Sequence, residues 1–345
     1  MKACVLEAVG ELRLKEVPTP KPKKGEVLLR VRACGICSSD IDRIFKTGTY
    51  HFPTIPGHEI AGEIVEVGEN VDKALLNRRA VVFPLLPCFR CRSCLAGKYA
   101  RCDHYNYFGS RCDGGFAEYL AVPIWNLKLF PNHLPFSVAA ICEPASVALH
   151  ALDMAQMSPG DTIAIVGSGT IGILAAMWAN ICGAGRVILI GRNSEKLICA
   201  QSFCTCETIN IYEHEPSEYV FETTQGIGAD ISMEFVGTSE GVSTVISTTK
   251  KGGIVVLTGN PAGKICLERS VYWKILRNEI NMRGTWNSEY SSARNDWDEA
   301  LNYMSNGQLD PKALISSFMP IDNFQLAFEM LRSRKDIIKI VFDLS

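Results

Sequence analysis

Residues 162–192, TIAIVGSGTIGILAAMWANICGAGRVILIGR, decide the fold of the second half of the chain. The stretch begins with a β-branched apolar run that predicts a buried strand. It passes through the glycine pattern Gly167-Ser168-Gly169-Thr170-Ile171-Gly172 and continues as a helix and a second strand. In this context the pattern predicts a dinucleotide site, because the glycines permit a tight turn, close approach of a pyrophosphate and close helix–strand packing. The helix N-terminus offers free N–H groups to the phosphates. The expected cofactor contacts are Gly167, Gly169, Thr170, Ile171 and Gly172.

Helix and strand patterns alternate after this stretch as far as residue 284, which predicts a doubly wound parallel sheet of the α/β class. The first half of the chain instead shows short strand patterns separated by glycine and proline turns, and the last sixty residues break the alternation. A chain of 345 residues is too long for one ordinary core. We therefore expect a dinucleotide-binding domain at 147–284 and a second domain built from 1–146 and 285–345.

Composition and charge exclude several classes of partner. The formal net charge is −2 and no block of five like charges occurs, so the sequence offers no basis for binding nucleic acid or an anionic membrane. We see no apolar run of the roughly 18 residues that span a bilayer. Glu7 stands where a signal peptide would have its apolar region. The expected location is the cytoplasm.

Four of the fourteen cysteines are clustered with the spacing of a metal site, C-x2-C-x2-C-x7-C: Cys88, Cys91, Cys94 and Cys102. Four thiolates can surround a tetrahedral Zn²⁺ with no open position, which is typical of a structural zinc. An iron–sulfur cluster is the alternative. The surrounding segment, about residues 84–106, has few large apolar side chains, so a metal would supply much of its folding energy.

A second candidate metal site draws its residues from separate motifs. Cys37 follows a predicted strand, and His58 lies 21 residues later in Pro56-Gly57-His58-Glu59. A thiolate and an imidazole are two of the three protein ligands of a catalytic zinc. The third could come from Glu59 or from Glu143, whose apolar neighbours indicate burial that a bound metal would compensate. The alternative is a structural cysteine and a solvated loop histidine.

These motifs resemble those of the zinc-dependent medium-chain dehydrogenases, which include alcohol, sorbitol and threonine dehydrogenases. The resemblance covers essentially the whole chain. It rests on Gly35-Ile36-Cys37-x-Ser39-Asp40, Gly57-His58-Glu59-x-x-Gly62, the four-cysteine segment, Glu143-Pro144 and the glycine pattern. It implies a mostly-β, GroES-like catalytic domain beside a Rossmann domain, with one catalytic and one structural zinc ion. The implied reaction is hydride transfer between a polyol or secondary alcohol and NAD(P).

The resemblance also assigns roles to individual residues. It implies that Cys37, His58 and Glu143 hold the catalytic zinc, with Glu59 on the metal or just beside it. The Ser39 hydroxyl would pass the substrate proton outward. The histidine that often continues this relay is missing, because Ile41 and Asp42 occupy its region. Water or Glu59 is therefore the expected route for the proton.

The cofactor preference departs from the family pattern. Most members place an acidic residue after the second strand of the dinucleotide domain, where it binds the ribose hydroxyls of NAD. Gly191 and Arg192 stand there in this chain. Loss of the carboxylate removes repulsion of a 2′-phosphate, and a guanidinium can bind that phosphate. We predict a preference for NADP(H) over NAD(H), with a surface arginine as the alternative.

The substrate prediction rests on a narrower likeness. Three segments look most like those of family members that oxidise a sugar-alcohol phosphate: Pro84–Cys88, Gly109–Tyr119 and Lys274–Arg277. A phosphate requires cations, and the candidates are Lys46 and Arg111. The candidates for lining the pocket, where the two domains should meet, are Trp286, Asn287 and Tyr290. The alternatives are solvated loop charges and simple packing.

Three other functions remain open. A non-phosphorylated polyol or secondary alcohol, of the sorbitol, butanediol or threonine type, would be oxidised with NAD. A zinc-free quinone or enoyl reductase and a non-enzymatic NADPH-binding protein are less compatible with Cys37, His58 and Glu143. The expected assembly is a homodimer or homotetramer joined through edge strands of the cofactor domain.

Overall fold

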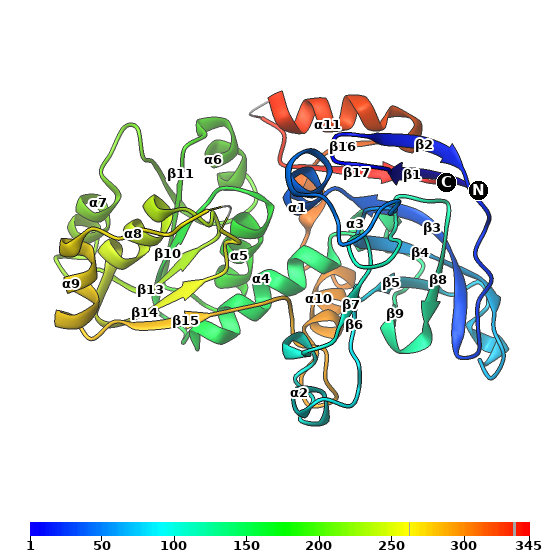
Figure 1. The fold of residues 1–345 in the computed structure, drawn as a ribbon. Helices are drawn as coiled ribbons and strands as arrows, with labels where there is room; N and C mark the ends of the chain where they lie inside the picture. Colours follow the sequence, from blue (N-terminus) through cyan, green and yellow to red (C-terminus); the bar gives the residue numbers. More distant parts are fainter. Residues whose placement is uncertain (262, 334–335) are drawn as a thin grey trace. The chain divides into compact units, whose positions relative to one another are not determined.

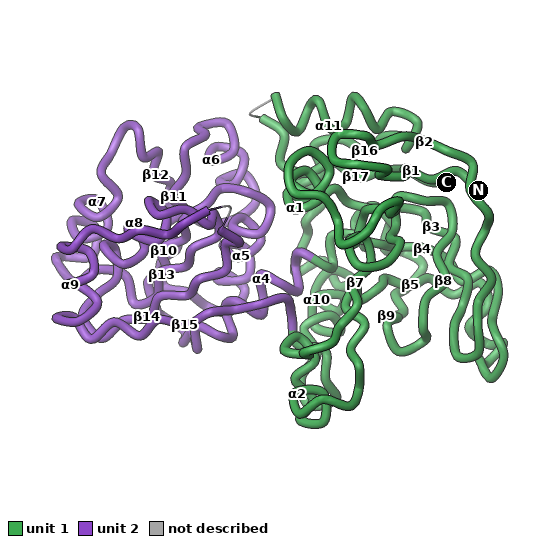
Figure 2. Tube along the Cα trace, in the orientation of Figure 1, with its two compact units in different colours: residues 1–143, 289–345 green, residues 144–288 purple. Residues whose placement is uncertain are grey.

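The computed structural model describes residues 1–261, 263–333 and 336–345. They form two compact units (Figure 2): unit 1 comprises Met1–Glu143 and Glu289–Ser345, and unit 2 comprises Pro144–Ser288. The chain thus leaves unit 1 once and comes back to it. The expected range 147–284 for the dinucleotide-binding domain falls inside unit 2.

Unit 2 contains, in its described residues, a six-stranded parallel sheet with the strand order β12-β11-β10-β13-β14-β15 (Figure 1). The strands are β10 (Thr162–Val166), β11 (Arg186–Gly191), β12 (Glu207–Asn210), β13 (Ala229–Glu234), β14 (Thr249–Leu257) and β15 (Asn281–Gly284). The order reverses between β10 and β13, and ligands of such sheets bind beyond the carboxyl ends of the strands at this reversal. The predicted doubly wound parallel sheet is confirmed.

The helices of unit 2 follow the strands as the alternation predicts. They are α5 (Thr170–Ile181), α6 (Ser194–Gln201), α7 (Pro216–Thr223), α8 (Ser239–Thr248) and α9 (Arg269–Arg277). The middle of α5 is wholly buried because its sequence is apolar on every side. In contrast, α9 has no buried residue. Alternate residues of the central strands pack with α8 in one apolar core that includes Ala164, Ile188, Val245 and Val255.

Unit 1 is mostly β. Its main sheet has the order β16-β17-β3-β4-β5-β9, with β8 also paired to β3, and every pair except β16–β17 is antiparallel. The strands are β3 (Glu26–Gly35), β4 (Glu59–Val67), β5 (Arg79–Val82), β8 (Tyr119–Pro123), β9 (Leu127–Leu129), β16 (Ile315–Pro320) and β17 (Lys339–Asp343), beside the hairpin β1 (Lys2–Leu6) and β2 (Leu12–Glu16). Strand β17 pairs directly with β3, so a segment from the end of the chain joins the main sheet formed by the first half of the chain.

Short helices and an irregular lobe surround this sheet. The helical segments are α1 (Ser38–Asp42), η1 (Arg43–Thr47), η2 (Lys73–Leu75), η4 (Ile124–Asn126), α3 (Phe136–Ala139), α10 (Asp296–Ser305), η5 (Pro311–Leu314), η6 (Ile321–Asn323) and α11 (Phe324–Ser333). The lobe contains β6 (Leu85–Leu86), α2 (Arg92–Leu95), η3 (Tyr99–Arg101) and β7 (Asn106–Tyr107). The core of unit 1 includes Leu6, Leu29, Ile64, Phe116 and Phe342.

The helix α4 (Cys142–Ala155) corrects an expectation about Pro144. The sequence of residues 137–157 predicts a helix that Pro144 interrupts, but the break between α3 and α4 falls earlier, at Ala140 and Ile141. Pro144 lies in the first turn of α4, where its missing N–H has no partner to lose.

One helical stretch passes a simple test of length and composition for a membrane span. Among the described residues, Phe136–Ala155 is long and apolar enough to cross a membrane, with a mean hydropathy of 1.3. However, 78% of the 18-residue window that passes this test is buried inside the protein, which is typical of a core helix.

Candidate active site

The first candidate site lies where β3 ends and β4 begins. Cys37 follows β3 and caps the N-terminus of α1, while His58 and Glu59 lie at the start of β4. Gly35 pairs with Glu59 in the antiparallel ladder between the two strands. This register explains how two motifs that are separated in sequence meet. The ligand atoms of Cys37, His58 and Glu59 all lie within 4.8 Å of one another, so this donor set fits a metal ion.

Asp40 orients the histidine of this site. Its carboxylate is fully buried, accepts a hydrogen bond from the Cys37 backbone N–H at 3.1 Å and lies 3.2 Å from Nδ1 of His58. Burial disfavours the charged imidazole, but the attraction of Asp40 outweighs it and raises the pKa of His58. A carboxylate on Nδ1 leaves Nε2 for a metal. Asp40 belongs to the Cys37 motif, but no role was predicted for it; its position three residues after Cys37 was the available signal.

Lys339 was missed altogether. It is the first residue of β17, and its Nζ donates to both carboxylate oxygens of Glu59, at 2.6 and 2.9 Å. It also donates to the Ile36 carbonyl at 3.0 Å. Both charged side chains are buried, so each compensates the cost of burying the other. Both carboxylate oxygens of Glu59 therefore have a cationic partner without a metal ion.

Glu143 is the other carboxylate expected at the metal. It is 6% exposed, and its Oε1 accepts a long hydrogen bond of 3.4 Å from the Tyr107 hydroxyl. Burial raises its pKa to about 7. A buried carboxyl group with such weak compensation is suited to ligating a cation, which would hold it ionised.

Ser39 lies between the thiol and a guanidinium. Its Oγ donates to Cys37 Sγ at 3.3 Å and accepts from Nη1 of Arg43 at 3.0 Å. Arg43 also lies 3.7 Å from the Asp40 carboxylate. Arg43 was not among the residues predicted for this site, because the family pattern points to a histidine in this region. A guanidinium cannot accept a proton, so Arg43 can orient the hydroxyl but cannot continue a relay.

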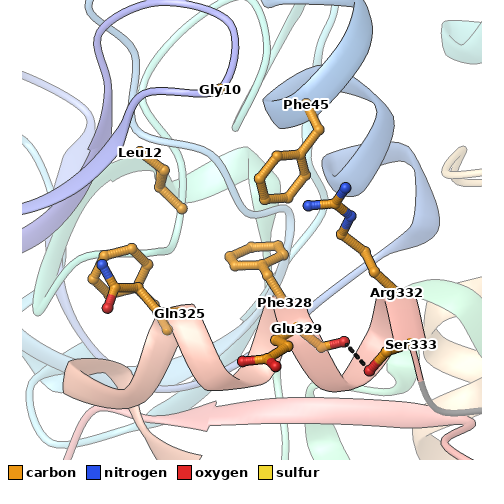
Figure 3. Close-up of a pocket in the computed structure, with 9 residues that line it drawn as sticks. Gly10, Leu12, Phe45, Gln325, Phe328, Glu329, Arg332 and Ser333 are labelled. Carbon is orange, nitrogen blue, oxygen red and sulfur yellow. Dashed lines mark hydrogen bonds between the residues drawn. The ribbon is translucent and has the colours of Figure 1, made fainter.

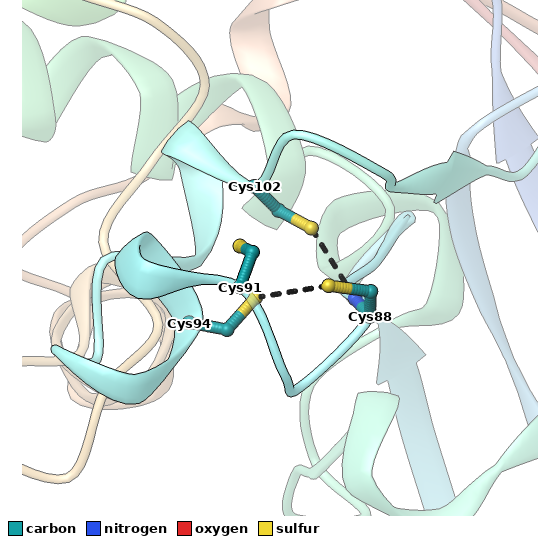
Figure 4. Close-up of side chains that lie close together, drawn as sticks. All are labelled: Cys88, Cys91, Cys94 and Cys102. Atoms are coloured by element: carbon teal, nitrogen blue, oxygen red, sulfur yellow. Dashed lines mark hydrogen bonds between the residues drawn. The ribbon is translucent and has the colours of Figure 1, made fainter.

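The four cysteines of the lobe converge on one point (Figure 4), and all their sulfur atoms lie within 4.8 Å of one another. Cys102 Sγ accepts a hydrogen bond from the Cys88 backbone N–H at 3.3 Å. Backbone N–H groups, first that of Arg90, lower the pKa of Cys88 to about 6 and favour its thiolate. Within the described chain none of the fourteen cysteines forms a disulfide. The geometry fits a tetrahedral metal ion.

The glycine pattern forms the turn from β10 into α5. Gly167 has φ +119°, a conformation that other residues rarely adopt, and a Cβ on Gly172 would lie 1.8 Å from the Gly167 carbonyl oxygen. Nothing lies within 4 Å of a Cβ built on Gly169, which caps the helix. Backbone at Gly169 is therefore open to an approaching ligand. Thr170 and Ile171 begin α5, whose N-terminal N–H groups would meet a phosphate.

A second turn lies against this glycine pattern. A Cβ on Gly167 would contact Val236 Cγ2 at 3.1 Å, in the loop after β13. Glu234, the last residue of β13, is buried, and its Oε1 accepts hydrogen bonds from the N–H groups of Val236 and Gly237, both at 2.6 Å. Glu234 thus fixes a loop at the carboxyl edge of the sheet. No sequence signal distinguished it from a strand residue.

Gly191 and Arg192 lie at the end of β11. A Cβ on Gly191 would lie 2.4 Å from Ser168 Oγ, so a larger side chain needs space that Ser168 occupies. The Arg192 side chain is exposed, and Asn193 caps α6 directly after it. The carboxyl end of β11 is therefore followed by the guanidinium of Arg192 and by the N-terminus of α6. Position 191 is a glycine and has no carboxylate.

The candidate substrate residues behave differently from one another. Lys46 is 69% exposed and pairs with Asp42 at 2.8 Å. Arg111 is half-buried: it stacks on Tyr50 and Tyr105, at 4.0 and 4.4 Å from the ring centroids, and donates to the Tyr50 hydroxyl at 3.1 Å. Arg111 is thus held by two aromatic rings, one of which, Tyr50, is 68% exposed, whereas Lys46 has a surface ion pair.

The three pocket candidates do not share an environment. Trp286 and Asn287 belong to unit 2, and Trp286 is 54% exposed. Tyr290 belongs to unit 1 and is buried, stacked on Phe83 with the ring centroids 4.1 Å apart. Its hydroxyl donates to the backbone carbonyls of Trp125 and Leu127. The structure favours interior packing over substrate contact for Tyr290.

An open pocket of about 510 Å³ lies elsewhere in unit 1, along α11 (Figure 3). Arg332 stacks over Phe45 at its edge, with 4.4 Å between the guanidinium carbon and the ring centroid. The lining side chains comprise Leu12, Phe45, Phe324, Gln325, Phe328, Glu329, Arg332 and Ser333. None of the candidate metal ligands is among these described residues, so the pocket is separate from the metal site.

Comparisons with known proteins agree on one family. A family model described as the alcohol dehydrogenase GroES-like domain matches residues 23–132, and one described as zinc-binding dehydrogenase matches residues 170–306. Galactitol 1-phosphate 5-dehydrogenase of Escherichia coli K12 is 34% identical over 330 residues, 95% of each chain. Sorbitol dehydrogenase of Bacillus subtilis is 30% identical over 348 residues, 99% of this chain and 96% of the relative.

Solved structures show the same likeness over the whole chain. Galactitol-1-phosphate dehydrogenase from Escherichia coli superposes with a TM-score of 0.93 at 32% identity, covering 99% of this chain and 100% of the other. A putative zinc-binding dehydrogenase from Sinorhizobium meliloti, bound to NADP, superposes with a TM-score of 0.91 at 28% identity, covering 99% and 98%.

Proposed function

Because the chain belongs to the zinc-dependent medium-chain dehydrogenases, and is thus an NAD(P)-dependent oxidoreductase of the alcohol and polyol type, we propose that it oxidises a sugar-alcohol phosphate with NADP⁺. The expected zinc and nicotinamide cofactors are confirmed by the family. The zinc-free and non-enzymatic alternatives are set aside on the same ground. The substrate, the preferred cofactor and the residue roles below are proposals.

Cys37, His58 and Glu143 are the residues that would hold the catalytic zinc. The choice of Glu143 over Glu59 is supported by the contacts of the two carboxylates, because Lys339 occupies both oxygens of Glu59 while Glu143 has one long hydrogen bond. A zinc ion held by these residues would supply a Lewis acid that lowers the pKa of a substrate hydroxyl, and a bound nicotinamide cofactor would supply the hydride acceptor. The lobe cysteines would hold the structural zinc ion.

Ser39 would accept the proton of the substrate hydroxyl. Arg43 donates a hydrogen bond to one lone pair of the Ser39 Oγ. The second lone pair of that oxygen is then available to accept the substrate proton. Glu59 is a poor proton acceptor because an ammonium group holds both of its oxygens. We therefore favour water over Glu59 as the acceptor beyond Ser39.

The NADP(H) preference is carried by the end of β11. Gly191 provides no carboxylate, Ser168 fills the space beside it, and Arg192 follows as an exposed cation. A 2′-phosphate would meet a positive charge here and no negative one at position 191. The test is the ratio of kcat/KM for NADP⁺ and NAD⁺ with the same alcohol. A clear preference for NAD⁺ contradicts the proposal.

The phosphorylated substrate is supported by the relative named for galactitol 1-phosphate and by Arg111, whose guanidinium stacks on Tyr50 and Tyr105. The second candidate is a free polyol such as sorbitol, supported by the sorbitol dehydrogenase relative. A panel of hexitols, each with and without a terminal phosphate, distinguishes the two. Equal kcat/KM for both forms would exclude recognition of the phosphate.

A homodimer or homotetramer joined through unit 2 is supported by the edge strand of its sheet and by exposed apolar side chains of α9. β15 is the last strand in the described sheet order, and the neighbouring α9 exposes Tyr272, Trp273 and Leu276. Exposed aromatic and aliphatic groups beside a strand edge are typical of subunit interfaces. Light scattering on the holoenzyme, with Leu276→Asp as the variant, tests this assembly. A wild-type mass equal to one chain contradicts it.

A further inference from the structure

Two cysteines face each other in unit 2, away from both metal sites. Cys204 and Cys206 lie between α6 and β12, and their sulfur atoms are 3.5 Å apart. The thiol of Cys204 also lies 3.1 Å from the Ala200 carbonyl oxygen at the end of α6. Nothing in the proposed reaction uses this pair.

The backbone around the pair is firmly held. Thr205, the residue between the two cysteines, donates its N–H to Asn180 Oδ1 at 2.8 Å and accepts from Asn180 Nδ2 at 2.9 Å. The Cys204 N–H donates to the Ala200 carbonyl at 3.0 Å. These contacts fix the turn from both sides, so the closeness of the two sulfur atoms is built into the fold.

The two thiols differ in access and in acidity. Cys204 is 9% exposed, whereas Cys206 is only half-buried and can be reached from solvent. The hydrogen bond from Cys204 lowers the pKa of Cys206, because it stabilises the thiolate. A partly exposed, acidic thiol with a second thiol behind it is the arrangement of an oxidisable pair.

We propose that Cys204 and Cys206 are a reversible oxidation site, in which a peroxide converts the two thiols into a disulfide. The Cys206 thiolate attacks one oxygen of hydrogen peroxide, the O–O bond breaks, and a sulfenic acid and hydroxide form. The sulfur of Cys204 then attacks that of Cys206, the S–O bond breaks, and water leaves with the Cys204 proton. Two thiols and one peroxide thus give one disulfide and two waters, and a dithiol reverses the reaction.

The disulfide would act on the dinucleotide site through α6 and β12. Closing the sulfur separation from 3.5 Å to about 2.05 Å pulls the end of α6 toward the start of β12. The other ends of these elements are joined by Asn210 Nδ2, which donates to Ser194 Oγ at 2.7 Å. Ser194 begins α6 just after Arg192. Oxidation should therefore weaken dinucleotide binding several-fold, whichever of NADPH and NADH the enzyme prefers.

The chemical test is peptide mapping of the zinc-loaded enzyme after treatment with hydrogen peroxide. Free thiols are alkylated under denaturing conditions, and the chain is digested with trypsin and chymotrypsin. Cleavage after Phe203 and Tyr212 releases residues 204–212, which contain Cys204 and Cys206 and no other cysteine. We expect this peptide to be unalkylated and lighter than the dithiol form by two hydrogen atoms. Recovery of the doubly alkylated peptide, or of a peptide with one over-oxidised sulfur, overturns the proposal.

The functional test is the dissociation constant of the reduced dinucleotide, followed by its fluorescence before and after peroxide and again after dithiothreitol. Cys206→Ser should make the constant insensitive to peroxide, whereas Cys199→Ser on the neighbouring helix should leave the response intact. Metal content is measured in parallel, because zinc loss would reveal oxidation at Cys37 or in the lobe instead. An oxidised peptide without any change in the dissociation constant would overturn the coupling to the cofactor site.

Discussion

The hydroxyl oxygen of Ser168 occupies the space that a side chain at position 191 would need. A Cβ built on Gly191 would lie only 2.4 Å from it. Ser168 belongs to the turn that follows β10, and Gly191 ends the neighbouring strand β11. The two residues therefore have to be considered together in any attempt to change the cofactor preference. An acidic residue at 191 competes with the glycine-pattern turn for the same space.

Gly191→Asp alone should destabilise unit 2 and bind neither cofactor well. Forcing a side chain into filled space costs about 1–3 kcal/mol. Ser168→Gly with Gly191→Asp removes the obstacle, and we expect this double variant to gain kcat/KM for NAD⁺ relative to NADP⁺. Ser168→Gly alone is the control. Thermal unfolding and the two kcat/KM values check the prediction, which fails if the single Gly191→Asp variant is as stable as the wild type.

Arg192→Ala should lower kcat/KM for NADP⁺ and leave that for NAD⁺ nearly unchanged. A hydrogen bond to a charged group contributes about 1.5–3 kcal/mol, so a loss of roughly ten- to a hundred-fold is expected. Because the Arg192 side chain is exposed, the variant should fold normally. Equal losses with both cofactors would show that Arg192 does not contact the 2′-phosphate.

Lys339→Met should be strongly destabilising, because it leaves the Glu59 carboxylate buried without its cation. Breaking a buried ion pair costs about 3–5 kcal/mol. Adding Glu59→Gln should restore much of the lost stability. Lys128→Met is a matched control, since its partner Asp298 is 60% exposed and such pairs contribute about 1 kcal/mol or less. Urea unfolding of the four proteins measures these differences, and similar values for Lys339→Met and Lys128→Met would contradict the prediction.

Asp40→Asn should weaken the catalytic metal site and spare the lobe. Loss of the carboxylate that orients a ligating histidine typically lowers metal affinity by roughly ten- to a hundred-fold. Chelator competition with metal analysis should therefore remove the catalytic zinc at lower chelator concentration, while the four-cysteine zinc stays. Cys94→Ser should show the opposite pattern. If Asp40→Asn kept its catalytic zinc as tightly as the wild type, Asp40 would have no positioning role.

Glu143 should make the stability of the protein without catalytic zinc depend on pH. Burial raises its pKa from the ordinary 4.5 to about 7, so between these values the folded protein binds more protons than the unfolded one. The contribution of Glu143 to the free energy of unfolding should therefore be most favourable below about pH 4.5. It should fall by about 2–3 kcal/mol as the pH rises to 7. Glu143→Gln should remove this contribution. Urea unfolding across the pH range checks it, and an unchanged slope in Glu143→Gln would contradict it.

Much of this architecture follows from local sequence pattern. The glycine pattern between two strands predicted the parallel sheet, and the structure gives physical reasons for two of its glycines: the φ of Gly167 and the contact of Gly172 with the Gly167 carbonyl. Cys37 and His58 meet as expected because they adjoin neighbouring antiparallel strands. Such features depend on spacing and on residue type, which are visible in a single sequence.

The remainder depends on contacts between distant segments. Lys339 pairs with Glu59 only because β17 inserts beside β3, and a lysine that begins a strand carries no mark of this partner. Tyr290 was a pocket candidate because of its position after a strand, whereas its environment is set by Phe83 and by two carbonyl groups. Pro144 was expected to interrupt a helix, whereas α4 begins at Cys142 and contains this proline in its first turn.

The position of Lys339 in the chain gives the metal site an order of assembly during synthesis. Cys37, His58 and Glu59 leave the ribosome early, and the ammonium group that holds Glu59 comes 280 residues after it, in β17. A nascent chain therefore carries Glu59 without its partner until β17 docks against β3. Premature termination before residue 339 would remove the buried strand β17 together with the cation that Glu59 needs, and so would disrupt the metal site from a position far from its motifs.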